Sequence, residues 1–134
     1  MTIETRSTPL TVGAIAFFVT GLLYSLGSIP VTAHILSERT LPVILGIPFY
    51  SGSFFASQGM SWVIASSFAF ILVGVADILI GFFLWKSLKN GALLAIATFP
   101  LIMAISIGGE VPLPLLVEPI KLLLIWPGRS SLRR

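Results

Sequence analysis

The chain has 134 residues, of which 56% are hydrophobic and only 10% are charged. Because a soluble domain carries roughly 25% charged residues, this composition excludes an ordinary water-soluble domain and indicates an integral membrane protein. The absence of cysteine excludes disulfides, thiolate zinc sites and Cys-ligated iron–sulfur clusters. The net charge of +3 comes from few residues in so apolar a chain. We attribute it to membrane topology, and we expect no nucleic-acid partner.

Two apolar segments lie in the first two thirds of the chain, and each is long enough to cross a bilayer, which takes roughly 17–25 helical residues. The first span is expected at about 11–36, after a Ser-Thr-Pro sequence that is typical of a helix start. The second span is expected at about 62–85, with Ser61 as its N-cap. Trp62 and Trp85 stand at its two ends, as in the aromatic belts of membrane proteins.

Two further apolar segments follow closely. The third span is expected at about 91–109, between a Lys-Asn-Gly turn and a Gly-Gly helix stop. The fourth is expected at about 111–126; it is short, and Pro112 and Pro114 predict an irregular start. The sequence therefore predicts a single all-α membrane domain, built as a bundle of four transmembrane helices.

The stretch at about 37–61, between the first two spans, is longer than most connections. Loops beyond roughly 12–15 residues are uncommon and tend to be functional or disordered, and this one is too apolar for disorder. We expect an ordered outer loop, which either caps the bundle at the membrane interface or forms a docking surface or lid. Its candidate docking residues are Phe49, Tyr50, Phe54 and Phe55.

The orientation of the bundle follows from its basic residues, because Lys and Arg are enriched in cytoplasmic segments. Four spans leave only Arg39 on the side of the long loop. The positive residues of the opposite side are Arg6, Lys86, Lys89, Arg129, Arg133 and Arg134. The sequence therefore predicts a protein of the cell membrane with both termini in the cytoplasm.

Three ionisable residues fall inside the predicted spans, namely Asp77, Glu118 and Lys121. Such residues are costly in lipid and are candidates for function. At 1.5 Å per helical residue, Asp77 lies about 5 Å and Lys121 about 4 Å to the cytoplasmic side of their span midpoints. Depth matching therefore predicts that Asp77 and Lys121 form an ion pair, with Glu118 beside them. The remaining polar residues expected near this layer are Thr20, Thr98 and Tyr24.

The role of these charges has two interpretations. Buried ion pairs can serve only to specify how helices pack. However, the two carboxylates and one lysine carry a formal charge of −1, so either one carboxyl holds a proton or a cation joins the group. On this second interpretation, the cluster binds or transfers a proton, an ion or a substrate. Small residues around Asp77, including Gly74 and Gly81, predict close packing of the second span against another helix.

Three functions from different classes remain open. The first is a non-catalytic accessory or assembly subunit of a larger membrane complex. The second is a small transporter or proton-linked carrier, a homodimer, that uses Asp77, Glu118 and Lys121. The third is an enzyme acting on a lipid or quinone-like substrate, with Tyr24 and His34 joining the carboxylates. We rank it last because no catalytic motif is recognisable, and we expect no cofactor and no bound metal ion.

Overall fold

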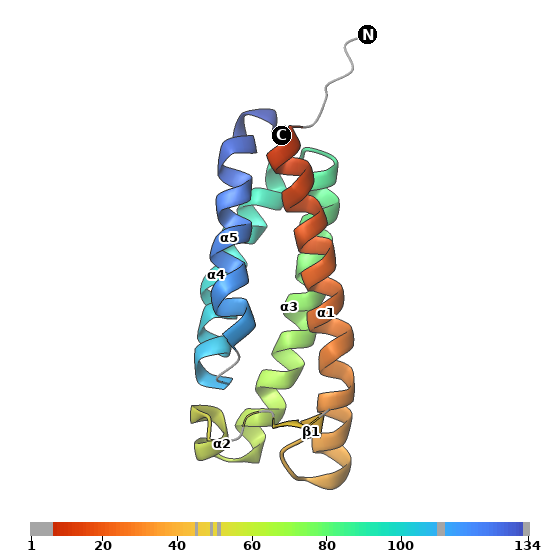
Figure 1. The fold of residues 1–134 in the computed structure, drawn as a ribbon, viewed down its shortest axis with the longest axis vertical. Helices are drawn as coiled ribbons and strands as arrows, with labels where there is room; N and C mark the ends of the chain where they lie inside the picture. Colours follow the sequence, from red (N-terminus) through yellow and green to blue (C-terminus); the bar gives the residue numbers. More distant parts are fainter. Residues whose placement is uncertain (1–6, 45, 49, 51, 110–111, 133–134) are drawn as a thin grey trace.

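The computed structural model describes residues 7–132 except residues 45, 49, 51, 110 and 111. In this part of the chain the fold is helical apart from one small hairpin. Figure 1 shows an elongated bundle in which the start of α1 and the end of α5 share one end, while the hairpin and α2 lie at the other. The elements are α1 (Thr8–Glu38), β1 (Val43–Ile44), β2 (Ile47–Pro48), α2 (Phe54–Gln58), α3 (Met60–Trp85), α4 (Lys89–Gly109), α5 (Pro112–Gly128) and the 3₁₀ helix η1 (Arg129–Ser131).

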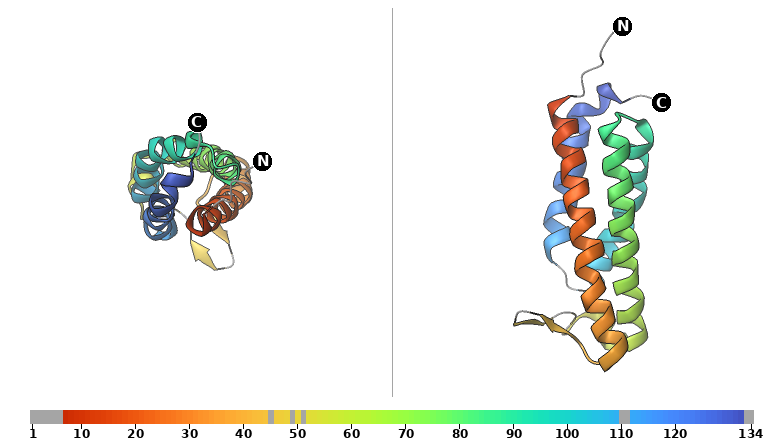
Figure 2. Two further views of the ribbon diagram at one scale, coloured as in Figure 1. Left: turned by 90° about the horizontal axis from the view of Figure 1, so that it is seen from above. Right: turned by 90° about the vertical axis from the view of Figure 1, so that its right-hand side faces the viewer.

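The four long helices pack as a ring in the order α1, α3, α4 and α5, and α5 closes back onto α1 (Figure 2). The strands β1 and β2 form an antiparallel pair in which Val43 lies opposite Pro48. This arrangement places α1 in contact with both α3 and α5, which carry the ionisable residues. It is therefore the arrangement that a shared polar layer requires.

The N-termini of α1 and α3 show how the local sequence determines where a helix begins. At α1, the hydroxyl of Ser7 accepts a hydrogen bond from the amide of Leu10, 3.4 Å away, as an N-cap does. The expectation that Ser61 caps the second span is wrong, because α3 begins at Met60 and its N-cap position is Gly59, which has no side chain to offer. The positive φ of Gly59, 119°, lets the chain turn sharply there between α2 and α3.

The start of α5 also differs from expectation. Pro112 and Pro114 do not leave it irregular, since the helix runs from Pro112 onward. A proline is tolerated in the first turn because the amides there have no partner within the helix, and its fixed φ already suits the helix. The 17 residues of α5 span about 26 Å at 1.5 Å per residue, a little less than a bilayer core of about 30 Å.

The helices expose many large apolar side chains, and their interior contains polar side chains beside apolar ones, unlike a typical water-soluble bundle. Leu72 on α3 is 70% exposed and Leu116 on α5 is 69% exposed, whereas Ser67 and Ser106 are buried. Three helices, α1, α3 and α4, are long and apolar enough to cross a membrane. These features are consistent with an integral membrane protein whose outer surface faces lipid.

The segment between α1 and α3 packs partly onto the end of the bundle. Tyr50 is buried against Val31, Ile35 and Val63, and this burial raises the pKa of its hydroxyl. Phe55, on α2, is partly buried. The other aromatic residues of this segment differ: Phe54 is 57% exposed, and Phe49 lies outside the described residues.

Candidate functional site

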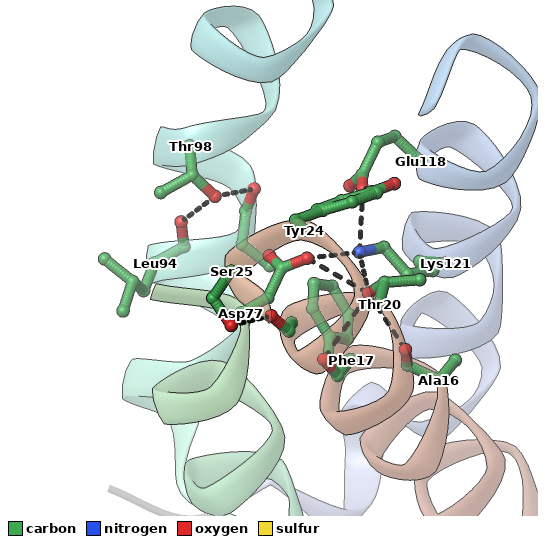
Figure 3. Close-up of polar contacts among 12 residues, drawn as sticks. Ala16, Phe17, Thr20, Tyr24, Ser25, Asp77, Leu94, Thr98, Glu118 and Lys121 are labelled. Carbon is green, nitrogen blue, oxygen red and sulfur yellow. Dashed lines mark hydrogen bonds and ion pairs between the residues drawn. The ribbon is translucent and has the colours of Figure 1, made fainter. Parts of the chain in front are cut away.

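Lys121 joins three helices through a buried set of polar contacts (Figure 3). Its ammonium nitrogen lies 2.7 Å from Asp77 Oδ2 and 2.8 Å from Glu118 Oε1, and it donates to Thr20 Oγ1 at 2.7 Å. The contacts to Asp77 and Thr20 are hydrogen bonds, and the contact to Glu118 is an ion pair. The predicted ion pair between Asp77 and Lys121 is therefore present, and we call Asp77, Glu118 and Lys121 the triad.

Two hydroxyl groups from α1 complete what we call the polar cluster. Thr20 Oγ1 lies 3.1 Å from Asp77 Oδ2, and Tyr24 donates its hydroxyl proton to Glu118 Oε1 at 3.0 Å. Thr20 and Tyr24 are one helical turn apart, so they share a face of α1. Each hydroxyl group is therefore hydrogen-bonded to a different carboxylate of the same cluster.

The cluster is almost completely shielded from solvent. Lys121 is 1% exposed and Asp77 is 2% exposed, and Glu118 is also buried. Phe17 adds an aromatic face, with its ring centroid 4.2 Å from Lys121 Nζ, close enough for a cation–π interaction. Sequence reasoning missed Phe17, although it precedes Thr20 by three residues and so lies on the same face of α1.

Glycine contacts hold α3 at the distance that Asp77 needs. A Cβ atom on Gly74 would lie only 2.5 Å from the backbone nitrogen of Ser25, and one on Gly21 would lie 2.7 Å from the carbonyl oxygen of Gly74. A Cβ atom on Gly81 would lie 3.0 Å from Ala14 O. These approaches bring the backbones of α1 and α3 together, as small residues do in membrane bundles. The predicted close packing around Asp77 is confirmed.

Thr98 does not join the polar cluster. Its hydroxyl donates within α4, with Leu94 O at 3.0 Å and Ala95 O at 3.2 Å, and it forms no hydrogen bond to another helix in the described part of the chain. Among the described residues, no hydrogen bond therefore joins Thr98 to the cluster in which it was expected. Depth matching predicts how far along a helix a residue lies, but it does not predict which way the helix is rotated about its axis.

The triad carries a formal charge of −1, because two carboxylates share one ammonium. The contacts of Asp77 fall on Oδ2 and those of Glu118 on Oε1. Among the described residues, neither carboxylate has a buried oxygen that lacks a hydrogen-bond partner. An uncompensated charge is expensive in a low-dielectric interior, so one added proton or cation would neutralise the site.

An apolar pocket adjoins the cluster on the side toward the hairpin. It has a volume of about 250 Å³, and we call it the tyrosine pocket because Tyr24 and Tyr50 both line it. Tyr24 thus contacts the pocket and also bonds to Glu118. Pro114, another lining residue, lies one turn before Glu118 on α5. Tyr24 is therefore shared by the pocket and the polar cluster.

The remaining polar candidate, His34, lies apart from the cluster. Its Nε2 is 3.2 Å from Thr40 Oγ1; Thr40 is exposed and His34 is partly exposed. Ten residues separate it from Tyr24 on α1, which corresponds to about 15 Å along the axis. His34 therefore does not combine with Tyr24 and Glu118 into one acid–base set. Within the described residues, no group of His, Asp and Glu side chains is arranged to hold a metal ion.

Comparisons with protein-family models, curated proteins and solved structures found no match to this chain. We therefore infer its function from the polar cluster, the tyrosine pocket and the helix surfaces.

Proposed function

We propose that the protein is a small proton-linked carrier of the cell membrane, with α1, α3, α4 and α5 spanning the bilayer and both termini in the cytoplasm. The observation that carries this proposal is the buried triad with a formal charge of −1, linked to the tyrosine pocket by the bond between Tyr24 and Glu118. The triad takes up the proton, and the pocket takes the cargo.

The distribution of described charges supports the proposed topology. Lys86, Lys89 and Arg129 flank the bundle end where α1 begins and α5 finishes, and Arg39 follows α1 at the opposite end (Figure 1). By the positive-inside rule the end with more basic residues faces the cytoplasm. If α5 did not cross the bilayer, Arg129 would lie outside, against this bias.

Proton uptake at Glu118 would change the wall of the tyrosine pocket. A proton on Glu118 removes its negative charge and weakens its ion pair with Lys121, which keeps Asp77 and Thr20 as partners. The hydroxyl of Tyr24 then faces a neutral acid in place of a carboxylate. Protonation and pocket occupancy are therefore coupled through one hydrogen bond.

The pocket limits what the cargo can be. Sites for drug-sized ligands enclose roughly 300–1,000 Å³, and this one is smaller, at about 250 Å³. Its wall is apolar apart from the hydroxyls of Tyr24, Ser28 and Tyr50. We therefore expect a small molecule with an apolar body and one hydrogen-bonding group.

Vesicles containing the purified protein and a trapped pH-sensitive dye would test this proposal. We expect at least one small amphipathic molecule in a broad panel to drive proton movement across the wild-type vesicles. Glu118→Gln should abolish that movement, and Glu38→Gln, the same change at an exposed position outside the cluster, should leave it intact. Folded protein that moves neither protons nor any cargo would contradict the carrier function.

A second candidate is an accessory subunit of a larger membrane complex, and exposed apolar residues at the hairpin end support it. Val43 on the hairpin and Phe54 on α2 are 62% and 57% exposed. Native extracts in mild detergent would distinguish the two candidates. An accessory subunit should migrate with a larger partner and lose it on Phe54→Ser. A homodimeric carrier should migrate at twice its own mass.

A further inference from the structure

A groove at the other end of the bundle combines two cations with an apolar floor. It has a volume of about 610 Å³ and runs between α4 and α5, and we call it the basic groove. Lys89 stands at the start of α4, and Arg129 follows the end of α5. The apolar residues that line it are Ala92, Leu93, Ile96, Leu122, Ile125 and Leu132, together with the ring of Trp126.

Among the described residues, no carboxylate neutralises the two cations. Neither Lys89 nor Arg129 forms an ion pair with a carboxylate within the described residues. Arg129 donates one hydrogen bond, to Trp126 O at 2.7 Å, and its guanidinium carbon lies 4.3 Å from the Trp126 ring centroid. A guanidinium has five N–H donors, so this contact orients the group and leaves most of its donors for a ligand.

The position of Trp126 relates the groove to the membrane surface. Trp85 ends α3 and Trp126 lies two residues before the end of α5, and both are exposed. Exposed tryptophans gather at the level of lipid headgroups. The apolar floor continues from there toward the middle of the bundle through Leu93 and Ile96, which are largely exposed. The groove therefore offers positive charge at headgroup level and apolar surface below it.

We propose that the basic groove binds one anionic phospholipid, with its phosphate between Lys89 and Arg129 and an acyl chain along α4 and α5. Basic pockets between transmembrane helices on the cytoplasmic side are suited to anionic headgroups. This inference rests on the membrane placement proposed above and is independent of carrier activity. It places the lipid about two turns from Lys121, because Ile125 lies four residues after Lys121 and Arg129 four residues after Ile125.

Lipid retention measured by native mass spectrometry would test the site. The protein would be extracted from vesicles made of equal parts phosphatidylglycerol and phosphatidylcholine. We expect wild-type protein to retain phosphatidylglycerol in preference. Lys89→Gln with Arg129→Gln should weaken that retention roughly 30-fold, since each basic residue at a membrane surface contributes about fivefold in affinity.

A matched control removes the same charge elsewhere. Lys86→Gln with Arg39→Gln also lowers the net charge by two, but neither residue lines the groove, and this variant should retain phosphatidylglycerol. Equal retention of both lipids by wild type, or equal loss in both double variants, would overturn the proposal. Displacement of the lipid by millimolar inorganic phosphate would also overturn it, because the acyl chain would then contribute nothing. Because the preference of the wild type is measured without any variant, misfolding of a variant leaves the test intact.

Discussion

The two neighbours of α1 are attached to it by different physical means. Against α3 the backbones touch, so that a Cβ atom on Gly74 would lie 2.5 Å from Ser25 N. Against α5 the distance at the level of Gly13 is ordinary, since a Cβ atom there would lie 3.7 Å from Leu124 Cβ, and the close approach lies at the end of α5, where a Cβ atom on Gly128 would lie 3.2 Å from Leu10 N. Lys121 bridges the wider space and bonds to Thr20. In the middle of the bundle, the α1–α3 interface thus depends on glycines without side chains, and the α1–α5 interface depends on the reach and charge of Lys121.

This difference distinguishes two ways of fixing helix positions: close backbone packing between α1 and α3, and specific polar contacts between α1 and α5. Apolar helices gain no hydrophobic energy by leaving lipid for each other, so they associate through packing and polar bonds. Glycine contacts bring α1 and α3 together over a long stretch. A buried ammonium, in contrast, strongly disfavours arrangements that leave it without a carboxylate, because an unpaired buried charge is costly.

Removing the ammonium should therefore have the largest effect. Lys121→Met leaves both Asp77 and Glu118 buried without their cation, and we expect it to lower the free energy of unfolding by about 3–5 kcal/mol. Adding Asp77→Asn should recover part of this loss, because only one carboxylate then remains. Denaturant titration in detergent micelles would measure both variants. A double variant whose loss equals the sum of the two single losses would show that the pair is not coupled.

Crowding the close interface should have the next largest effect. Gly74→Ala forces a methyl group against the backbone of α1, which cannot yield as a side chain can, so we expect a loss of about 1–3 kcal/mol. Gly27→Ala is the matched control, because nothing lies within 4 Å of its Cβ position. The control should be neutral or more stable by up to about 1 kcal/mol, since alanine favours a helix over glycine. Equal losses in the two variants would contradict the close contact.

Tyr24→Phe sharpens the comparison on the polar side. It removes the bond to Glu118 and keeps the edge-to-face contact with Phe70, whose ring centroid is 6.1 Å away. Hydrogen bonds inside membrane proteins contribute about 0.6 kcal/mol on average and up to about 1.7, so we expect a loss in that range. The same titration in micelles would measure it. A loss as large as that of Lys121→Met would mean that the hydroxyl, and not the ammonium, organises α5.

The smallest effect is expected at Thr98. Thr98→Val removes a hydroxyl that bonds only within α4, so stability should change by less than about 0.5 kcal/mol, as for substitutions away from any specific contact. Thr20→Val makes the same change where the hydroxyl contacts both Lys121 and Asp77. A parallel thermal denaturation of the two variants would measure the difference. Equal shifts would place Thr98 in the polar cluster after all.

The sequence by itself determined the helical, membrane-suited character of the chain and the level of its charges. Long apolar runs fold as helices in lipid because every backbone group must be bonded internally. A constant rise of 1.5 Å per residue then converts position into depth, which is why the pairing of Asp77 with Lys121 was predictable. The glycine face around Asp77 was also predictable, because helical periodicity places Gly74 and Gly81 on the same face of the helix as Asp77.

Only the tertiary structure decided which residues at that level face one another. Thr98 and Thr20 are alike in type and similar in depth, yet the rotation of α4 turns one away while α1 turns the other toward Lys121. Helix rotation depends on the packing of side chains from all neighbouring helices at once, so it cannot be computed from one helix alone. The same holds for the contact of Phe17 with Lys121 and the bond from Tyr24 to Glu118. It holds as well for the tyrosine pocket and the basic groove, each of which is formed by more than one helix.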